Sequence, residues 1–125
     1  MKDLKQYFSI PTCPEDVYNA LTNKKMIEIW TGEEAVMEPV PGTEFSLWGG
    51  NISGVNLEFE ENRKIVQQWY FGEHEEPSIV TIILHPDKKN TSIELRHTNI
   101  PDDAFLNIKE GWEEDYFGSL RELFI

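Results

Sequence analysis

Residues 107–125 read NIKEGWEEDYFGSLRELFI, and this stretch decides the fold. Its apolar side chains recur every three or four residues, which is the spacing that lines one face of an α-helix. The apolar positions are Ile108, Trp112, Tyr116, Leu120 and Leu123. Asn107 and Glu110 have the spacing of a capping box, so we predict that the helix starts at Asn107. About eighteen residues at 1.5 Å each form a rod of roughly 27 Å, and its apolar face needs a wall of apolar side chains to cover it.

The length and charge of the chain limit what it can be. It has 125 residues, 39% of them apolar, with 11 basic and 23 acidic side chains and a net charge of −12. This length favours one domain, spanning residues 1–125, around one core. The negative charge repels phosphate groups and anionic lipids, so we expect neither a nucleic-acid partner nor a membrane partner.

The sequence also predicts the cellular compartment and the absence of bound metal. No apolar run is long enough for a signal peptide or a membrane span, which predicts a cytoplasmic protein. A single cysteine, Cys13, excludes an internal disulfide and lacks the partner spacing of a thiolate metal site. His74 lies among Glu73, Glu75 and Glu76, but adjacent loop residues cannot all converge on one ion, so we interpret them as a solvated acidic loop. We expect no metal and no cofactor.

The residues before the final helix favour one strand, two short helices and then a series of strands. The alternation over residues 3–10 stops at Pro11. Pro14 suits the first turn of a helix, Asn23 suits the start of a second helix, and Gly32 suits its end.

From residue 34 onward the apolar period becomes two, and turn residues interrupt it at regular intervals. The predicted strands are 34–39, 43–48, 51–60, 64–72, 78–85 and 91–98. With residues 3–10 they make seven strands, which successive hairpins join into an antiparallel sheet. Only the final helix is long enough to cover that sheet, so we predict an α+β fold.

Strand parity predicts which side chains face the helix, because alternate residues of a strand point the same way. We predict that Phe45 and Leu47 point inward from one strand, and that Ile93, Leu95 and His97 do so from the last one. The other predicted inward sets are Val55, Leu57 and Phe59, with a bulge at Gly54, and Val80, Ile82 and Leu84. Over residues 64–71 either Ile65, Trp69 and Phe71 or the opposite set faces inward, and the first set is the more apolar.

Several ordered motifs carry a family resemblance that runs nearly from end to end. They are Pro14-Glu15-Asp16-Val17, Ala20-Leu21-Thr22, Trp30, Pro41-Gly42-Thr43-Glu44-Phe45, Gly49 to Gly54, Lys64 to Trp69, Ser78 to Leu84, Ile100-Pro101, Gly111-Trp112 and Tyr116-Phe117. In these motifs the chain resembles the activator of heat-shock protein 90 ATPase homologue-like family, within the START/Bet v 1-like (SRPBCC) superfamily. The resemblance implies a helix-grip fold, a curved seven-stranded antiparallel sheet around one long C-terminal helix, with two short helices after the first strand.

Two departures limit what the resemblance implies about function. The family often has Arg directly after the tryptophan of its IVxxW motif, whereas Tyr70 follows Trp69 here. The co-chaperone members also carry a separate N-terminal domain. This chain starts at the first strand of the grip domain, so we expect it to be similar to the single-domain, bacterial-type members. For these the resemblance implies a cavity and no defined ligand, and stimulation of an ATPase does not simply transfer.

The candidate ligand-binding residues are side chains expected between the sheet and the helix. They are Trp30, Phe45, Trp69, Phe71, His97, Trp112 and Tyr116. The aromatic ones either line a cavity for a small apolar or aromatic molecule or form a packed core. A rim is expected at Trp30, Gly32 and the loop 72–77. His97 either bonds a ligand, acts as an acid or base, or is a satisfied structural group.

Three functions stay open at this level. The first is non-enzymatic binding of a small apolar ligand, with His97 or Tyr116 orienting a polar end. The second is a chaperone-associated interaction module, for which the acidic run at 110–115 is either a docking surface or simply a solvated helix face. The third is an enzyme of the cyclase, aromatase or hydrolase kind found in the wider superfamily. The usual hydrolase, phosphate-loop and metalloprotease motifs are absent, so we assign no catalytic residue.

Overall fold

The computed structural model describes residues 1–71 and 77–125, and it consists of one antiparallel sheet and two helical parts. The strands are β1 (Lys2–Ile10), β2 (Glu44–Leu47), β3 (Ile52–Glu60), β4 (Lys64–Trp69), β5 (Ser78–Asp87) and β6 (Asn90–Ile100). The helices are α1 (Pro14–Thr22), α2 (Lys24–Thr31), α3 (Phe105–Gly111) and α4 (Phe117–Glu122). Short helical turns η1 (Trp48–Gly50) and η2 (Asp102–Ala104) and a π-helical segment η3 (Trp112–Tyr116) complete the element order.

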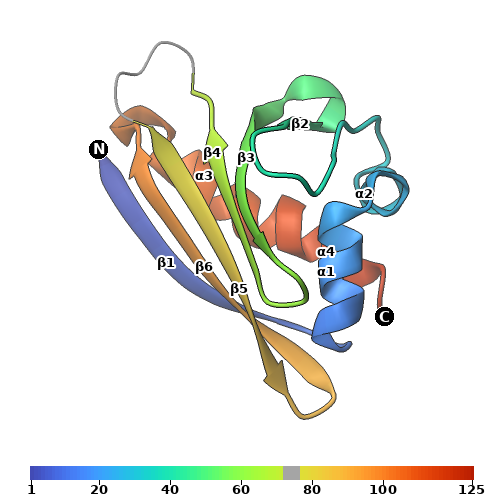
Figure 1. Ribbon diagram of the computed structural model, residues 1–125. Helices are drawn as coiled ribbons and strands as arrows, with labels where there is room; N and C mark the ends of the chain where they lie inside the picture. Colours follow the sequence, from blue (N-terminus) through green and yellow to red (C-terminus); the bar gives the residue numbers. More distant parts are fainter. Residues whose placement is uncertain (72–76) are drawn as a thin grey trace.

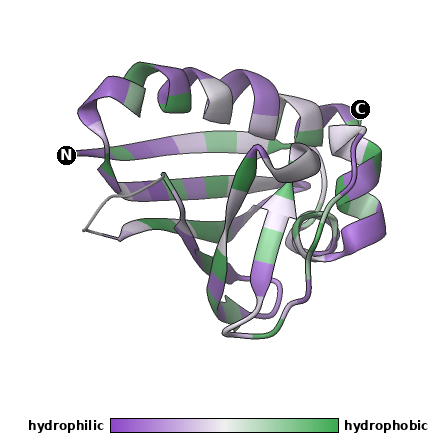
Figure 2. Cartoon of the chain, turned by 90° about the horizontal axis from the view of Figure 1, so that it is seen from above, coloured by the Kyte–Doolittle hydropathy of each residue, from purple (hydrophilic) through white to green (hydrophobic). Residues whose placement is uncertain are grey.

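The sheet has the strand order β1-β6-β5-β4-β3-β2, and the final helical run α3-η3-α4 lies along one face of it (Figure 1). Helices α1 and α2 lie near the α4 end of that run. Figure 2 gives the same arrangement from above, with the helical run on one side of the strands. The buried apolar side chains form one cluster between these layers, so the predicted α+β fold with a sheet-covering C-terminal helix is confirmed.

The two short helices start and end where the sequence predicts. Pro14 occupies the first turn of α1, with Glu15 and Asp16 beside it at the positive end of the helix dipole. The Asn23 side chain caps α2 by accepting a hydrogen bond from the Met26 backbone N–H at 3.2 Å. Gly32 ends α2 in the left-handed conformation, with φ of +76°.

The prediction of seven strands is wrong, because residues 34–39 do not form one. Within the described residues this segment makes one isolated bridge, between Val36 and Ser46. Its alternation is real, since Ala35 and Met37 are buried and Val36 is exposed. Pro39 and Pro41, however, have no N–H to donate to a longer ladder. The segment therefore packs against the sheet as an irregular connection, and within the described residues the sheet has six strands.

Strand parity is confirmed in β2, β5 and β6. Phe45 and Leu47 are buried from β2, and His97 is fully buried from β6. The remaining inward residues of these strands are Val80, Ile82, Leu84, Ile93 and Leu95, all of them buried. In β4, Ile65 and Trp69 are buried with Gln67 between them, whereas Phe71 lies beyond the strand and is partly buried.

The predicted inward face of β3 is wrong. Gly54 and Asn56 are its buried residues, and Leu57 is 39% exposed. The bulge lies between Asn56 and Glu58, not at Gly54, and it changes which side chains beyond it face the helix. Phe59 consequently packs against the core although Leu57 does not. The sequence misleads here because the outward set is more apolar than the inward one.

The final helical run begins earlier than predicted and contains one wide turn. It starts at Phe105 with Ala104 as its N-cap, so Asn107 lies inside the helix and the predicted capping box is wrong. In η3 the Phe117 backbone N–H donates to the Trp112 carbonyl, five residues back. This extra residue in the turn lets Tyr116 and Phe117 both face the core, where they are 5% and 0% exposed. The predicted burial of Trp112, Tyr116 and Leu120 is confirmed.

The wide turn makes opposite predictions for the two glycines of this run. A Cβ on Gly118 would lie 3.1 Å from the Glu113 carbonyl oxygen, whereas on Gly111 it would meet only the Asp115 carboxylate at 3.9 Å. We expect Gly111→Ala to stabilise the fold by about 0.5–1 kcal/mol through helix propensity. We expect Gly118→Ala to destabilise it by about 1 kcal/mol through the close contact. Urea denaturation of both variants checks this, and shifts of the same sign would contradict the π-helical turn.

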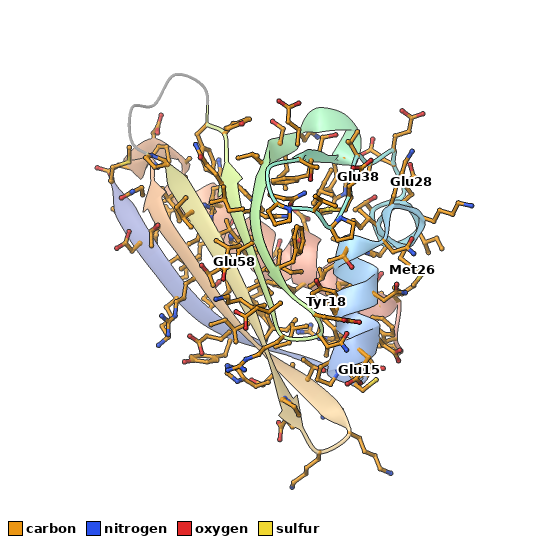
Figure 3. The ribbon with its side chains drawn as sticks, in the orientation of Figure 1. Glu15, Tyr18, Met26, Glu28, Glu38 and Glu58 are labelled. Carbon is orange, nitrogen blue, oxygen red and sulfur yellow. The ribbon has the colours of Figure 1, made fainter. Side chains whose placement is uncertain are left out.

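Apart from Glu94, which is buried, the described acidic residues lie wholly or partly at the surface. Glu15 on α1 and Glu38 before β2 are exposed, and Figure 3 labels both with Glu28 of α2. The Glu28 carboxylate accepts a hydrogen bond from the Ala35 backbone N–H at 3.2 Å, which ties the irregular connection to α2. Among the described residues no helix has the length and apolar character needed to cross a bilayer.

Candidate functional site

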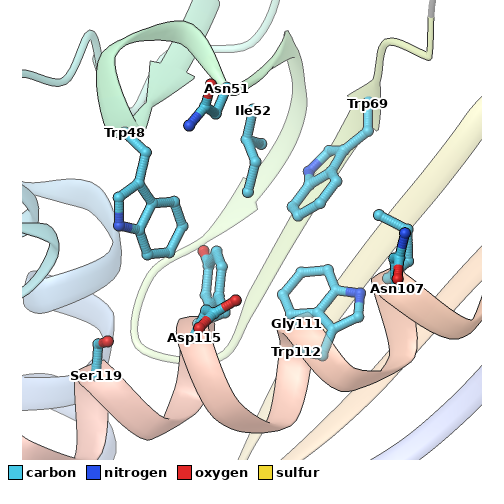
Figure 4. A pocket seen from close by; sticks show the side chains of 11 residues that line it. Trp48, Asn51, Ile52, Trp69, Asn107, Gly111, Trp112, Asp115 and Ser119 are labelled. Atoms are coloured by element: carbon cyan, nitrogen blue, oxygen red, sulfur yellow. The ribbon is translucent and has the colours of Figure 1, made fainter. Parts of the chain in front are cut away.

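A groove of about 370 Å³ opens between the final helical run and the strands β3 and β4 (Figure 4). Most of its apolar wall is aromatic, and we call it the aromatic groove. Its lining residues are Trp48, Asn51, Ile52, Trp69, Asn107, Ile108, Gly111, Trp112, Asp115, Tyr116 and Ser119. Its volume falls at the lower end of the range of small-molecule sites in proteins.

Two neighbouring rows of the helical run face the groove. One row, with a spacing of four, carries the small or polar residues Asn107, Gly111, Asp115 and Ser119. The adjacent row carries Ile108, Trp112 and Tyr116, which supply the apolar part. The groove therefore has one polar side and one aromatic side, and both are set by the same helix.

The indoles of Trp69 and Trp112 stack on each other in the groove wall, with ring centroids 4.7 Å apart and planes 27° apart. The far side of Trp112 stacks on Phe117 at 5.4 Å. Both faces of the Trp112 ring are therefore covered, and the edge of the ring lines the groove. Each indole of the stacked pair donates its N–H to the buried interior, and the two acceptors belong to separate polar chains.

The first polar chain runs from Trp112 to β6. The Trp112 indole N–H donates to His97 Nδ1 at 3.1 Å. Because Nδ1 accepts, the ring hydrogen lies on Nε2, which is 2.9 Å from the Ser78 hydroxyl. The Ser78 hydroxyl in turn donates to the Thr98 carbonyl at 2.9 Å. Burial lowers the pKa of His97 to about 4, so the ring is neutral near pH 7 and both its nitrogens have protein partners.

The second polar chain runs from Trp69 to the irregular connection before β2. The Trp69 indole N–H donates to Gln67 Oε1 at 3.1 Å, and Gln67 Nε2 donates to Asn56 Oδ1 at 3.0 Å. Asn56 Nδ2 then donates to the Glu38 carbonyl and the Thr43 hydroxyl, both at 3.2 Å. Asn56 and Gln67 are 0% and 3% exposed, so leaving either amide unpaired would be costly. This chain of hydrogen bonds fixes the orientation of the Trp69 indole.

Trp48 forms the opposite wall of the groove and has an unusual backbone. Its φ is +51°, a conformation that costs a non-glycine residue roughly 1–2 kcal/mol. Its ring packs against Trp30 at 5.6 Å and Tyr116 at 6.0 Å, which holds the half-buried indole in place. Figure 4 shows Trp48 facing Trp69 and Trp112 across the groove.

Tyr116 brings a hydrogen-bond donor to the groove. The residue is 5% exposed, and burial raises the pKa of its hydroxyl above the usual value, so the group stays protonated. The hydroxyl makes no hydrogen bond to any described residue. It is also not one of the fully buried polar atoms that lack a hydrogen-bond partner. It is therefore open to a partner that enters the groove.

The structure divides the seven predicted site residues into two groups. Trp69, Trp112 and Tyr116 come together in the groove wall. Trp30, Phe45, Phe71 and His97 do not line it: Trp30 and His97 contact its walls from behind, Phe45 is core, and Phe71 packs beside His97. The predicted rim at 72–77 falls mostly outside the described residues, as does the acidic loop around His74. Whether any of the seven binds a ligand stays a prediction.

Sequence reasoning missed Trp48, Asp115, Gly111 and Ser119 as groove residues. A signal for three of them was present, since Gly111, Asp115 and Ser119 form a spacing of four beside the apolar row. Small residues at that spacing leave an open groove along one face of the helix. Trp48 carried no such signal, because a tryptophan before Gly49-Gly50 gives no indication that its backbone is left-handed.

Comparison with known proteins gives one consistent family. Residues 11–124 match the model of the family described as "Activator of Hsp90 ATPase homolog 1-like protein". The activator of 90 kDa heat shock protein ATPase homolog of Dictyostelium discoideum is 32% identical over 126 residues, which cover 98% of this chain and 33% of the relative. The human homolog 1 is 29% identical, over 90% of this chain and 34% of the relative. The chain thus spans about a third of the length of these curated relatives.

Solved structures share the fold. An HSP90 activator from Plasmodium falciparum superposes with a TM-score of 0.89 at 24% identity, covering 98% of this chain and 96% of the other. The Aha1 dimer from Colwellia psychrerythraea superposes with a TM-score of 0.86 at 18% identity, covering 99% and 96%. On the match over residues 11–124 and the 32% identity to the Dictyostelium relative, the chain belongs to the Activator of Hsp90 ATPase homolog 1-like family.

Proposed function

We propose that the protein binds a small, largely aromatic molecule in the aromatic groove without acting on it chemically. The observation that carries the proposal is the pair of stacked indoles, Trp69 and Trp112, whose orientation two buried polar chains fix. A site whose walls are already ordered loses little conformational entropy when a ligand enters. Burial of the ligand's apolar surface then supplies most of the affinity.

The polar atoms of the groove support binding more than catalysis. His97 has both ring nitrogens engaged by Trp112 and Ser78 and does not line the groove. The Tyr116 hydroxyl is a neutral donor suited to orienting a carbonyl or ether oxygen of the ligand. Asn51, Asn107 and Ser119 offer further neutral hydrogen bonds at the groove edge.

Titration with uncharged aromatic probes tests this proposal. Indole and 2-naphthol are added to ¹⁵N-labelled protein, and the indole N–H signals of the four tryptophans are followed by NMR. We expect saturable shifts at Trp48, Trp69 and Trp112, which line the groove, and smaller shifts at Trp30, which does not. Equal small shifts at all four signals, without saturation, would contradict the proposal.

A groove-filling variant makes the test specific. Gly111 lines the groove, and a Cβ added there would meet only the Asp115 carboxylate within 4 Å. We expect Gly111→Leu to fold and to weaken probe binding at least about tenfold by occupying the groove. Glu114→Leu adds the same side chain to an exposed position of the same helical run and should leave binding unchanged. Unchanged binding by Gly111→Leu would place the probes elsewhere.

A second function, interaction with a chaperone of the Hsp90 type, is favoured by the names of the relatives. The Dictyostelium and human relatives are named as activators of the 90 kDa heat shock protein ATPase, and the yeast relative as an Hsp90 co-chaperone. This chain matches about a third of each, so the partner is proposed for this chain and the activity belongs to the longer proteins. The net charge of −12 suits a basic partner surface.

The chaperone proposal is tested with purified Hsp90 from the same organism. We expect binding that weakens as salt rises from 50 to 300 mM, because screening shortens the reach of the acidic surface. A change in the rate of ATP hydrolysis would extend the proposal to activation. Absence of binding at low salt and high protein concentration would argue against a chaperone partner, and it would leave the groove proposal untouched.

A further inference from the structure

The aromatic groove has an uncompensated negative charge. Asp115 is the one charged residue among its described lining residues, and the others are apolar or neutral. Asp115 forms no ion pair with another described residue. Among the residues that the structure describes, no Lys, Arg or His lines the groove to attract an anion. The chain as a whole has a net charge of −12, so the surrounding potential has the same sign.

The Asp115 carboxylate is directed along the helix into the groove. Its Oδ2 lies 3.9 Å from the position that a Cβ on Gly111 would occupy, one turn back in the polar row. Figure 4 shows the carboxylate between Trp48 on one side and Trp112 on the other. The missing side chain at Gly111 leaves space beside the carboxylate for a ligand group. The charge therefore belongs to the groove as well as to the surface of the helix.

A second polar group points to a ligand at the same place. Tyr116 lines the groove and is only 5% exposed, and its hydroxyl has no hydrogen-bond partner among the described residues. It lies next to Asp115 in the chain and on the adjacent row of the helix. A donor hydroxyl beside an unpaired carboxylate suits a molecule that carries an oxygen acceptor or π-system near a positively charged group.

We propose that the ligand of the aromatic groove is a small aromatic amine, whose ring lies against the indole walls and whose ammonium group binds the Asp115 carboxylate. This inference rests on the proposed binding function and names the class of ligand. Because both faces of Trp112 are covered, that ring offers no face to a cation, and Asp115 is the anionic group available among the described lining residues. Asp115 is an exposed residue, so its pairing with the ammonium group contributes as a surface ion pair does, and the neighbouring indoles add apolar contact with the ring of the ligand.

Three matched indoles test the proposal. Tryptamine carries an ammonium group, tryptophol an uncharged hydroxyl, and indole-3-propionate a carboxylate, all on the same ring. We expect tryptamine to bind at least about fivefold more tightly than tryptophol, as charge-assisted hydrogen bonds are stronger than neutral ones. We expect indole-3-propionate to bind most weakly. Affinities come from the NMR shifts of the groove tryptophans.

Two variants with the same change in net charge show whether Asp115 is the source of the preference for tryptamine. Asp115→Asn should bring the affinities for tryptamine and tryptophol to within about twofold of each other, mainly by weakening tryptamine binding. Glu114→Gln removes a charge from the next residue of the same helical run, which does not line the groove, and should keep most of the preference. An equal loss in both variants would mean that the overall charge, not Asp115, attracts the amine.

The outcomes separate this inference from the function on which it rests. If tryptophol binds in the groove and tryptamine binds no better, the amine proposal fails and the binding function stands. If none of the three indoles gives saturable shifts at Trp48, Trp69 and Trp112, the binding function fails as well. A preference for indole-3-propionate would overturn the proposed charge of the ligand.

Discussion

Gly54→Ala is expected to destabilise the fold by at least about 3 kcal/mol, because the site has no space for a methyl group. A Cβ at Gly54 would clash with the backbone carbonyl oxygen of Gln68 and would lie 2.9 Å from Cε1 of Phe45. Gly54 pairs with Trp69 across the β3–β4 ladder, so relief of the clash must separate these two strands. Urea denaturation followed by circular dichroism measures the loss.

Ser53→Ala is the matched control for this prediction. Ser53 is the neighbouring residue of β3, points to the opposite face and makes no side-chain hydrogen bond to a described residue. We expect its substitution to change the free energy of unfolding by less than about 0.5 kcal/mol. A Gly54→Ala variant as stable as Ser53→Ala would contradict the close approach of β3 and β4.

Acid is expected to remove about 3 kcal/mol of stability through His97. Burial lowers the pKa of His97 to about 4 in the folded protein, against an unfolded value near 6.5. Between these values the unfolded chain binds a proton that the folded protein does not, so stability rises with pH. The contribution is complete above about pH 6.5 and is lost as the pH falls to about 4. Protonation would also break the hydrogen bond from Trp112, since Nδ1 could no longer accept it.

His97→Asn separates this effect from the titration of carboxylates. Its side-chain oxygen can still accept the Trp112 N–H, but it does not titrate. We expect the variant to lose stability less steeply than the wild type between pH 6.5 and 4, measured by urea denaturation at each pH. In the folded wild type, ¹⁵N NMR should show the hydrogen on Nε2 throughout pH 8–5. A His97 ring that titrates near pH 6.5 in the folded protein would refute the prediction.

The apolar face of the final helix could be predicted because one property, its period, determines it. Trp112, Tyr116 and Leu120 are buried as the spacing indicates. The same reasoning failed to predict the secondary structure of residues 34–39. The period of two correctly predicts that Ala35 and Met37 are buried, but it does not show whether the backbone has hydrogen-bond partners in the sheet. Burial and ladder pairing are separate properties, and alternation reports only the first.

The buried polar chains could not be predicted, because their members are far apart in the sequence. Hydrophobicity places Asn56 on the outward face of β3, and it gives no reason for a polar residue at Gln67, on the otherwise apolar inward face of β4. Both side chains can face inward because Gln67 donates a hydrogen bond to Asn56 and accepts one from the Trp69 indole. These hydrogen bonds can be recognised only once the pairing of the strands is known. The seven predicted site residues were selected by hydrophobicity, so they include residues of the core as well as of the groove.

The pairing of β1 with β6 has a consequence for how the chain is made. Lys2 lies opposite Ile100 and Ile10 opposite Thr91, so β1 has no partner in the sheet until β6 has been translated. The helical run that covers the sheet is made later still. At ordinary rates of translation, residues 101–125 take roughly one to five seconds to synthesise. Until these residues are made, no helical run can cover the apolar face of the sheet, and we expect the chain to be exposed to aggregation during that interval.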